Sequence, residues 1–167
     1  MPTKQRRYPI KNKDVKQIIE EAQHKLGLNL EELFDVKAGV EVVESEVALI
    51  YLISGKPVIY KINDRLLPTL LFSEFLTTAP KVVVDMGAVP YVCKGATVMA
   101  PGIVRVEGEF AAGSLVLVVD VKYGKALAVG ESLLDGAVVR QTKKGPVVKV
   151  LHYVGDKVWD YIKQLSD

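Results

Sequence analysis

Apolar residues recur with a helical period in the first part of the chain. Over residues 12–26 they lie three or four positions apart, which places them on one side of a helix. Asn12 is a candidate N-cap for this helix, and Gly27 is suited to end it. A second, shorter helical turn is predicted over residues 30–34. The apolar positions of the longer helix are Val15, Ile18, Ile19, Ala22 and Leu26.

From residue 36 the chain changes to runs of β-branched and aromatic residues, which favour strands. Gly55-Lys56 is expected to form a tight hairpin turn between two of these strands. Residues 66–76 are predicted to be helical, and Pro68 is compatible with this helix because proline is tolerated in the first turn. The three predicted strands cover residues 36–43, 47–54 and 57–62.

Residues 77–80 form a short helix-breaking stretch, Thr-Thr-Ala-Pro, and the chain after it is mostly β in character. A strand is predicted over residues 81–85, then a short helix over residues 87–94 that Gly95 ends. Many short strands separated by glycine turns favour a small closed barrel, and a helical period from Val158 to Leu165 predicts a C-terminal helix. The further predicted strands cover residues 97–99, 103–109, 115–122, 126–132, 137–141 and 146–153.

Composition places the chain among globular proteins and excludes several classes of site. It has 167 residues, of which 49% are apolar, and a formal net charge of +2. A single cysteine, Cys93, excludes an internal disulfide framework and a multi-cysteine zinc site. No apolar run is long enough to span a bilayer, and no apolar stretch follows the basic N-terminus as in a signal peptide. We therefore expect a cytoplasmic protein without metal or cofactor.

The charges are unevenly distributed along the chain. Residues 1–16 carry a net charge of +5, residues 17–80 carry −5, and residues 81–167 carry +2. Such blocks indicate either surfaces for different partners or chance clustering of solvated charges. The first block is a candidate basic arm for phosphates, and the second a candidate surface for a protein partner. The arm comprises Lys4, Arg6, Arg7, Lys11, Lys13 and Lys16.

The chain lacks the common catalytic motifs, so we expect no enzyme. It has no glycine-rich phosphate loop and no HExxH or GxSxG sequence. Asp85 is either a general base or a cap for the following helix, and we favour the cap. Cys93 is interpreted as a buried, unreactive thiol. His152 is expected to be packed and hydrogen-bonded, although a base-contacting pair with Tyr153 is the alternative.

Residues 94–103, Lys-Gly-Ala-Thr-Val-Met-Ala-Pro-Gly-Ile, carry the main signal of a binding site. Pro101-Gly102 suits the centre of a type II turn. The small residues of the segment would let an RNA backbone approach closely and accept hydrogen bonds from main-chain N–H groups. Met99 and Ile103 offer apolar platforms for a base, and Lys94 would meet a phosphate.

Five ordered blocks in the second half of the chain resemble a PUA domain, a small pseudo-barrel that binds structured RNA. The blocks are Asp85-x-Gly87-Ala88, Gly95-Ala96-x-Val98-x-x-Pro101-Gly102-Ile103, Ala128-Val129-Gly130, Lys144-Gly145 and His152-Tyr153-x-x-Asp156-x-x-Trp159. The resemblance implies an RNA surface built from the glycine loop after the first helix, the next strand and the last strand. With the neighbouring lysines, the candidate RNA-binding residues are Lys94, Gly95, Ala96, Met99, Ala100, Pro101, Gly102, Ile103, Lys143, Lys144, His152 and Tyr153.

The N-terminal half is similar to the pre-PUA domain of the malignant-T-cell-amplified-sequence family, which ligatin shares. The strand pair at residues 50–60 and Leu67-Pro68-Thr69-Leu70 carry this resemblance. It implies an α+β fold like that of the archaeal stand-alone members: an α/β pre-PUA domain with helices packed on a small antiparallel sheet (1–78), a β-rich PUA pseudo-barrel with short helices (79–155), and a C-terminal helix packed on the body (156–167).

Three functions compete at this stage. The family resemblance implies an RNA-binding protein associated with translation, which acts on a tRNA acceptor end or small-subunit rRNA in initiation, reinitiation or recycling, with the small ribosomal subunit and a protein partner in reach. The second is a non-catalytic RNA-binding accessory subunit of a tRNA or rRNA modification enzyme. The third is a protein-interaction module that has lost RNA binding.

Overall fold

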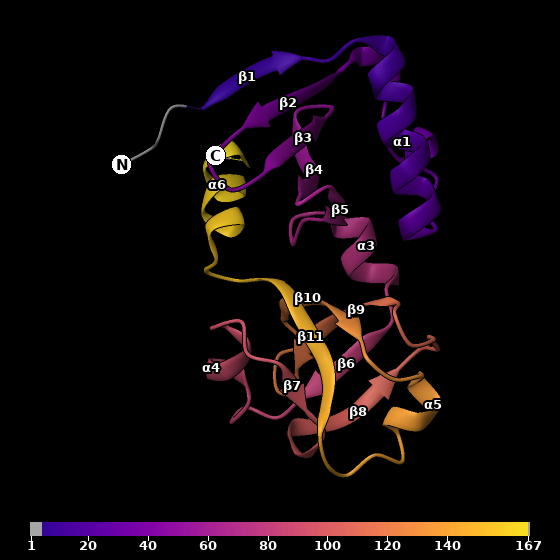
Figure 1. Ribbon diagram of the computed structural model, residues 1–167, viewed down its shortest axis with the longest axis vertical. Helices are drawn as coiled ribbons and strands as arrows, with labels where there is room; N and C mark the ends of the chain where they lie inside the picture. Colours follow the sequence, from indigo (N-terminus) through magenta and orange to yellow (C-terminus); the bar gives the residue numbers. More distant parts are fainter. Residues whose placement is uncertain (1–4, 167) are drawn as a thin grey trace. The chain divides into compact units, whose positions relative to one another are not determined.

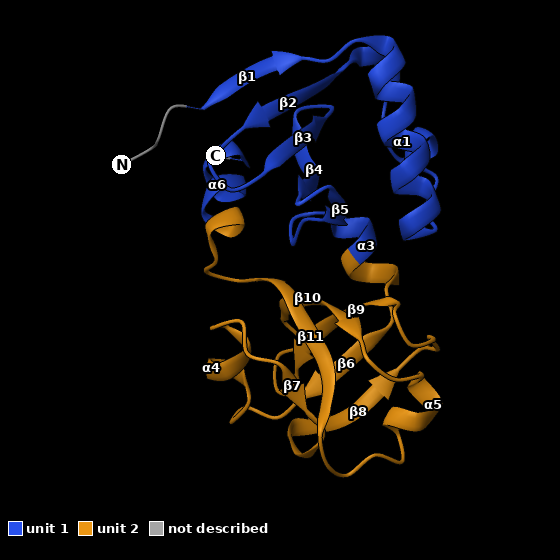
Figure 2. Cartoon of the chain, viewed as in Figure 1, with its two compact units in different colours: residues 1–75, 160–167 blue, residues 76–159 orange. Residues whose placement is uncertain are grey.

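The chain folds into two compact units. The computed structural model describes residues 5–166, and Figure 2 shows the division. Unit 1 comprises residues 1–75 and 160–167, and unit 2 comprises residues 76–159. Within the part of the chain that the structure describes, no helix is long and apolar enough to cross a membrane.

Unit 1 is built on a five-stranded antiparallel sheet with the strand order β1-β2-β3-β4-β5 (Figure 1). Each strand pairs with its neighbour in the sequence. Short turns join β2 to β5 in succession, whereas residues 10–39, which contain helices, separate β1 from β2. β1 lies at one edge, and its register places Arg7 opposite Val43. The strands are β1 (Arg6–Pro9), β2 (Val40–Glu44), β3 (Leu49–Ile53), β4 (Lys56–Ile62) and β5 (Arg65–Pro68).

Two tight turns shape this sheet. The predicted hairpin between β3 and β4 is confirmed, but its centre is Ser54-Gly55, both with positive φ, one residue earlier than expected. Asn63 and Asp64 also have positive φ and turn the chain back, so that β5 pairs with β4. The predicted helix over residues 66–76 is therefore wrong. Only α3 (Ser73–Thr78) is helical there, because the Asn-Asp turn and strand pairing override the helical spacing.

The helices of unit 1 follow the predicted pattern with different ends. α1 (Asn12–Leu26) buries its apolar side and ends at Gly27, which has a φ of 67°. The predicted cap at Asn12 is wrong, because Asn12 is already helical and Lys11 occupies the cap position without a side-chain hydrogen bond. α2 (Leu30–Leu33) confirms the second turn, and the 3-10 helix η1 (Val36–Ala38) delays the start of β2 to Val40.

Unit 2 is a curled, mixed six-stranded sheet with the order β7-β11-β10-β9-β6-β8. β6 and β9 run parallel, and the other neighbours are antiparallel. The predicted α+β fold is confirmed, but the sheet is a half-barrel whose edge strands β7 and β8 are not neighbours. The strands are β6 (Lys81–Val84), β7 (Val98–Met99), β8 (Ile103–Glu107), β9 (Leu115–Asp120), β10 (Ala126–Ser132) and β11 (Pro146–Tyr153).

Short helices connect these strands. They are α4 (Val89–Val92), the 3-10 helix η2 (Ala100–Gly102) and α5 (Gly136–Val139). The predicted strand over residues 137–141 is wrong, because the amides of Val138 and Val139 donate to the carbonyl of Asp135 and close a helical turn. Only Val139 of this segment is buried, so a short helix satisfies its packing as well as a strand would.

A valine-rich core fills unit 2, and Gly130 shows how closely its strands pack. A Cβ atom at Gly130 would lie 2.3 Å from Cγ1 of Val148 and 2.9 Å from the carbonyl oxygen of Lys149. The register between β10 and β11 shifts at this point, between Val129 and Gly130. Only glycine therefore fits where β11 crosses β10. After β11, α6 (Lys157–Ser166) begins, and the amide of Trp159 donates to Asp156 over 2.7 Å.

Candidate nucleic-acid interface

The loop after α4 is held by close packing on β11. Gly95 has a φ of 86°, and a Cβ atom there would lie 2.9 Å from Cε1 of Tyr153. A side chain at this position would therefore push away the tyrosine ring as well as strain the backbone. The amides of Lys94, Gly95 and Ala96 all donate to carbonyls of the α4 turn. These three N–H groups are thus already used, which contradicts the expectation that they would serve a phosphate.

The predicted type II turn at Pro101-Gly102 is wrong. Residues Ala100–Gly102 form η2, and Gly102 is not among the glycines with positive φ. The space beside Gly102 is also tight, since a Cβ atom would lie 3.3 Å from Cβ of Ala88. The carbonyl of Gly102 also accepts a 2.9 Å hydrogen bond from the amide of Asp85. The segment is therefore fixed against the end of β6.

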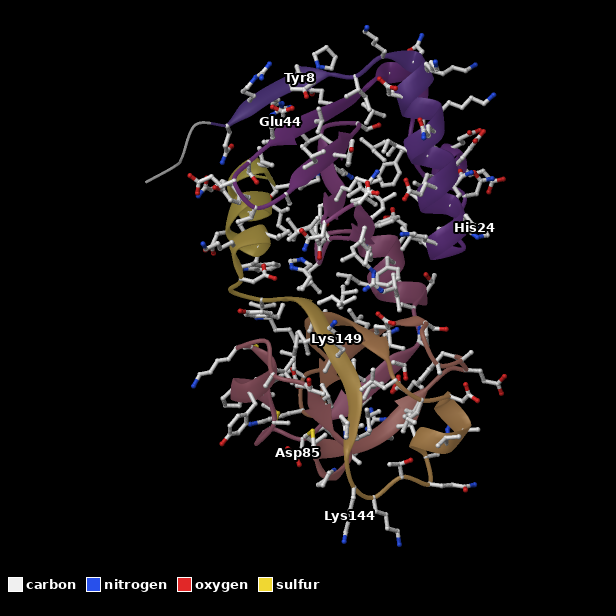
Figure 3. The ribbon with its side chains drawn as sticks, viewed as in Figure 1. Tyr8, His24, Glu44, Asp85, Lys144 and Lys149 are labelled. Carbon is white, nitrogen blue, oxygen red and sulfur yellow. The ribbon has the colours of Figure 1, made fainter. Side chains whose placement is uncertain are left out.

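Strand pairing brings the two candidate segments of unit 2 together. Met99 lies opposite Pro146, and the amide of Ala100 donates to the carbonyl of Gly145 over 2.9 Å. The loop that carries Lys143 and Lys144 therefore adjoins β7 and η2, and Figure 3 shows Lys144 extending from this loop. We call residues 94–103 together with Lys143 and Lys144 the lysine–glycine surface.

Exposure divides the predicted residues of this surface into two groups. Met99 is 48% exposed, whereas Ala100 is only 7% exposed and supports the surface from below. Gly95, Gly102 and Ile103 are partly buried. Besides Met99, the exposed positions among the predicted residues are Lys94, Ala96, Pro101, Lys143 and Lys144, and within the described residues the three lysines have no ion-pair partner.

His152 and Tyr153 support the surface from inside the unit. The side chain of His152 is fully buried, and its Nδ1 lies 2.8 Å from Oδ2 of Asp156. The same carboxylate oxygen accepts a hydrogen bond from the amide of Tyr153. The structure therefore favours the packed, hydrogen-bonded alternative for His152, with the Tyr153 ring lying under Gly95.

Asp85 and Cys93 show no arrangement for chemistry. Oδ1 of Asp85 accepts a 2.9 Å hydrogen bond from the amide of Ala88, which caps the turn before α4 (Figure 3 labels Asp85). Burial raises the pKa of the partly buried Cys93 thiol, against a weaker opposite effect of Lys125, so the unreactive protonated form dominates near neutral pH. Within residues 5–166 no three His, Cys, Asp or Glu side chains are grouped to hold a metal ion.

Part of the predicted basic arm is an edge strand of unit 1, and the two arginines of that strand are paired. Nε of Arg7 lies 2.8 Å from Oε2 of Glu41, and a second hydrogen bond makes this contact bidentate. That hydrogen bond lowers the pKa of Glu41 and raises the pKa of Arg7. Arg6 lies 3.6 Å from Glu44, which also accepts a hydrogen bond from the Tyr8 hydroxyl (Figure 3). Lys11, Lys13 and Lys16 are exposed on or beside α1, and Lys4 lies outside the described residues.

Sequence reasoning missed three side chains near the lysine–glycine surface. Tyr91 lies on α4 and is 67% exposed. Arg105 and Arg140 line a pocket of about 310 Å³ together with Ala100 and Ile103. The helix of Tyr91 is too short for a reliable period, and the arginines are far apart in sequence, so only the fold shows that they are neighbours of the predicted residues.

The chain matches two domain families, one in each half. Residues 80–154 match the PUA domain, and residues 6–73 match the domain of unknown function DUF1947. An uncharacterised protein of Methanocaldococcus jannaschii is 37% identical over 157 residues, which covers 93% of this chain and 96% of that protein. Translation machinery-associated protein 20 of Saccharomyces cerevisiae is 27% identical over 140 residues, with 79% and 77% covered.

A solved structure and a partial match extend this comparison. The crystal structure of a hypothetical protein from Pyrococcus horikoshii superimposes with a TM-score of 0.73 at 33% identity, and 94% of this chain and 99% of that chain are covered. A probable tRNA pseudouridine synthase B of Pyrobaculum arsenaticum is 36% identical over 76 residues, which are 46% of this chain and 23% of that protein.

Proposed function

We propose that this chain is an RNA-binding protein of the translation machinery. It belongs to the family in which a DUF1947 (pre-PUA) domain precedes a PUA domain, and this family includes Translation machinery-associated protein 20. The ligand of this chain is a tRNA acceptor end or a small-subunit rRNA element, and the chain works in the cytoplasm. The chain supplies binding rather than catalysis.

One observation carries this proposal: unpaired lysines border a rigid surface of small residues. Lys94, Lys143 and Lys144 have no ion-pair partner among the described residues, and a side chain at Gly95 or Gly102 would crowd its neighbours. The lysines would neutralise phosphates, and the small residues would let the sugar–phosphate backbone approach closely.

Unpaired bases would be bound by the exposed apolar side chains. RNA-binding proteins commonly stack single-stranded bases on aromatic rings. Tyr91, which is 67% exposed, would supply an aromatic platform, and Met99, which is 48% exposed, an apolar one; the two residues flank the glycine loop in the sequence. A single-stranded end, such as that of a tRNA, fits this arrangement better than a continuous duplex does.

Charge reversal at the surface tests the proposal. Lys94→Glu combined with Lys143→Glu should weaken tRNA or rRNA binding at least about tenfold at low salt, because each phosphate contact releases condensed counterions. The slope of log affinity against log salt concentration should become shallower by about two, as expected when two phosphate contacts are lost. Fluorescence anisotropy at several salt concentrations measures both quantities.

The control carries the same change of charge elsewhere in unit 2. Lys122→Glu with Lys157→Glu alters two exposed lysines that lie outside the lysine–glycine surface. This double variant should lose far less affinity than the first. Equal losses in the two double variants would show that only net charge matters, and the proposed surface would be abandoned.

A second candidate is a binding subunit for an RNA-modifying enzyme. The match to the probable tRNA pseudouridine synthase B favours it, since the similar region there accompanies an RNA-modifying domain that this chain does not match. Copurification with a modification enzyme instead of small ribosomal subunits would support this candidate over a role in translation.

A further inference from the structure

Unit 1 contains a pocket of about 300 Å³ where α1 meets strands β1 to β4. This volume is at the small end of ligand sites and suits one side chain rather than a folded element. Ile10, Ile18, Val42 and Leu49 form its apolar wall. Its polar lining consists of Tyr8, Asp14, Gln17, Glu21, Tyr51 and Lys61.

The side chain of Tyr51 is almost entirely buried, and its hydroxyl has no hydrogen-bond partner among the described residues. Its side chain lines the pocket, and the residue is only 6% exposed. Burial raises the pKa of Tyr51, and the negative charges of Glu21 and Asp14 raise it further. Polar atoms of nearly buried side chains are usually hydrogen-bonded, so this hydroxyl is available to a group that enters the pocket.

The remaining polar groups of the pocket are mostly acceptors. Asp14 and Gln17 have no hydrogen-bond or ion-pair partner within the described part of the chain. Lys61 is the one cation of the lining, and its Nζ lies 3.7 Å from Glu21 and 3.7 Å from Asp64, so these carboxylates offset its charge. The pocket therefore offers unused acceptors in a negative field.

We infer that this pocket receives an arginine side chain of a partner protein. A guanidinium group carries five N–H donors in one plane, and Asp14, Gln17 and Tyr51 of the lining all have oxygen atoms that can accept from such donors. Its flat face also stacks on aromatic rings, and Tyr8 supplies one in the wall. A lysine ammonium has three donors at one point and would satisfy fewer of these groups.

The position of the pocket favours a protein as the source of this arginine. Tyr8 and Ile10 lie on or beside β1, the edge strand of the five-stranded sheet. An extended segment of a partner could pair along such an edge while one of its side chains enters the pocket. RNA is disfavoured here, because Asp14 and Glu21 would repel phosphates.

A peptide titration tests the inference. The probe is acetyl-Ala-Arg-Ala-amide, and its control is the same peptide with citrulline, which keeps the shape but loses the charge. Adding the arginine peptide to the ¹⁵N-labelled full chain should shift the amide signals of Gln17, Glu21 and Tyr51, with an affinity near the millimolar range. Tyr51→Phe should weaken this binding about tenfold, because it removes one hydrogen bond to a charged donor.

Two further variants distinguish binding in the pocket from general attraction of the arginine peptide to acidic residues. Asp14→Asn should also weaken binding, whereas Glu20→Gln removes an exposed carboxylate of α1 outside the pocket and should have no effect. Equal shifts with the citrulline peptide, no shifts at about 10 mM arginine peptide, or the same shifts on adding a short RNA would overturn the inference. Tyr51→Phe should leave RNA affinity unchanged. A failure of the arginine-pocket inference can therefore be told apart from a failure of the proposed RNA binding.

Discussion

At the scale of single residues, buried polar groups and glycines fix the loops of unit 2. Gly95 and Gly130 each lie where a Cβ atom would meet a neighbour, Tyr153 in one case and Val148 in the other. The resemblance to a known domain pointed to both glycines, but the sequence alone did not show what they approach. The physical reason is steric and depends on β11, which follows them by at least sixteen residues.

Asp120 is a buried polar residue that holds the turn between β9 and β10. The residue is 4% exposed, and its carboxylate accepts hydrogen bonds from the amides of Tyr123 and Lys125. The bond from Tyr123 is the largest cause of the lowered pKa of Asp120. A carboxylate with a depressed pKa stabilises the fold above its unfolded pKa, near 4, and loses that effect as pH falls through its folded value.

We therefore expect Asp120→Ala to lower the urea midpoint of unfolding at pH 7, because two amides lose their acceptor. Asp120→Asn should cost less, since it keeps one acceptor oxygen. The gap between wild type and Asp120→Ala should narrow as pH falls well below 4, where the wild-type carboxyl becomes protonated. A gap that stays constant from pH 7 to pH 2.5, about 1.5 pH units below the usual Asp value, would show that the carboxylate charge has no part in holding the turn.

At the scale of elements, strand pairing decides which basic residues are available. Arg6 and Arg7 belong to β1 and contact Glu44 and Glu41 of β2. Lys11 and Lys13 lie beyond this strand and are exposed without ion-pair partners among the described residues. The predicted basic arm therefore divides into a paired part and a part that is free to contact phosphates.

Two double variants test this division with equal changes of charge. Lys11→Ala with Lys13→Ala should reduce RNA affinity. The slope of log affinity against log salt concentration should become shallower by about one to two, because one or two phosphate contacts are lost. Arg6→Ala with Arg7→Ala should change RNA affinity less and lower the free energy of unfolding by at most about 1 kcal/mol, as expected for exposed ion pairs. A larger loss of RNA affinity in the arginine variant would contradict the assignment.

Periodicity predicted the long elements well and the short ones poorly. α1, β10 and β11 were predicted nearly to the residue, because α1 has apolar positions at helical spacing and glycine-containing turns flank the two strands. β5 and α5 were assigned the wrong type, since four-residue elements have too few positions to show a period. The same limit hid Tyr91, which lies on the four-residue helix α4.

At the scale of the whole molecule, the two units carry surfaces of opposite character. Unit 2 presents unpaired lysines around Gly95 and Gly102, whereas unit 1 presents a pocket of acceptors beside an edge strand. The net charge of +2 conceals the uneven distribution of charge, because the +5 of residues 1–16 cancels the −5 of residues 17–80. Such a chain is suited to hold an RNA with one unit and a protein with the other.

The central claim is that the lysine–glycine surface of unit 2 binds RNA, and one titration tests it most directly. Labelled tRNA, with and without its CCA end, and purified small ribosomal subunits would be titrated with the full chain at two salt concentrations. We predict binding that weakens steeply with salt, and a further loss on removal of CCA if the acceptor end is the ligand. Binding that ignores salt, or no binding to either RNA, would contradict the claim.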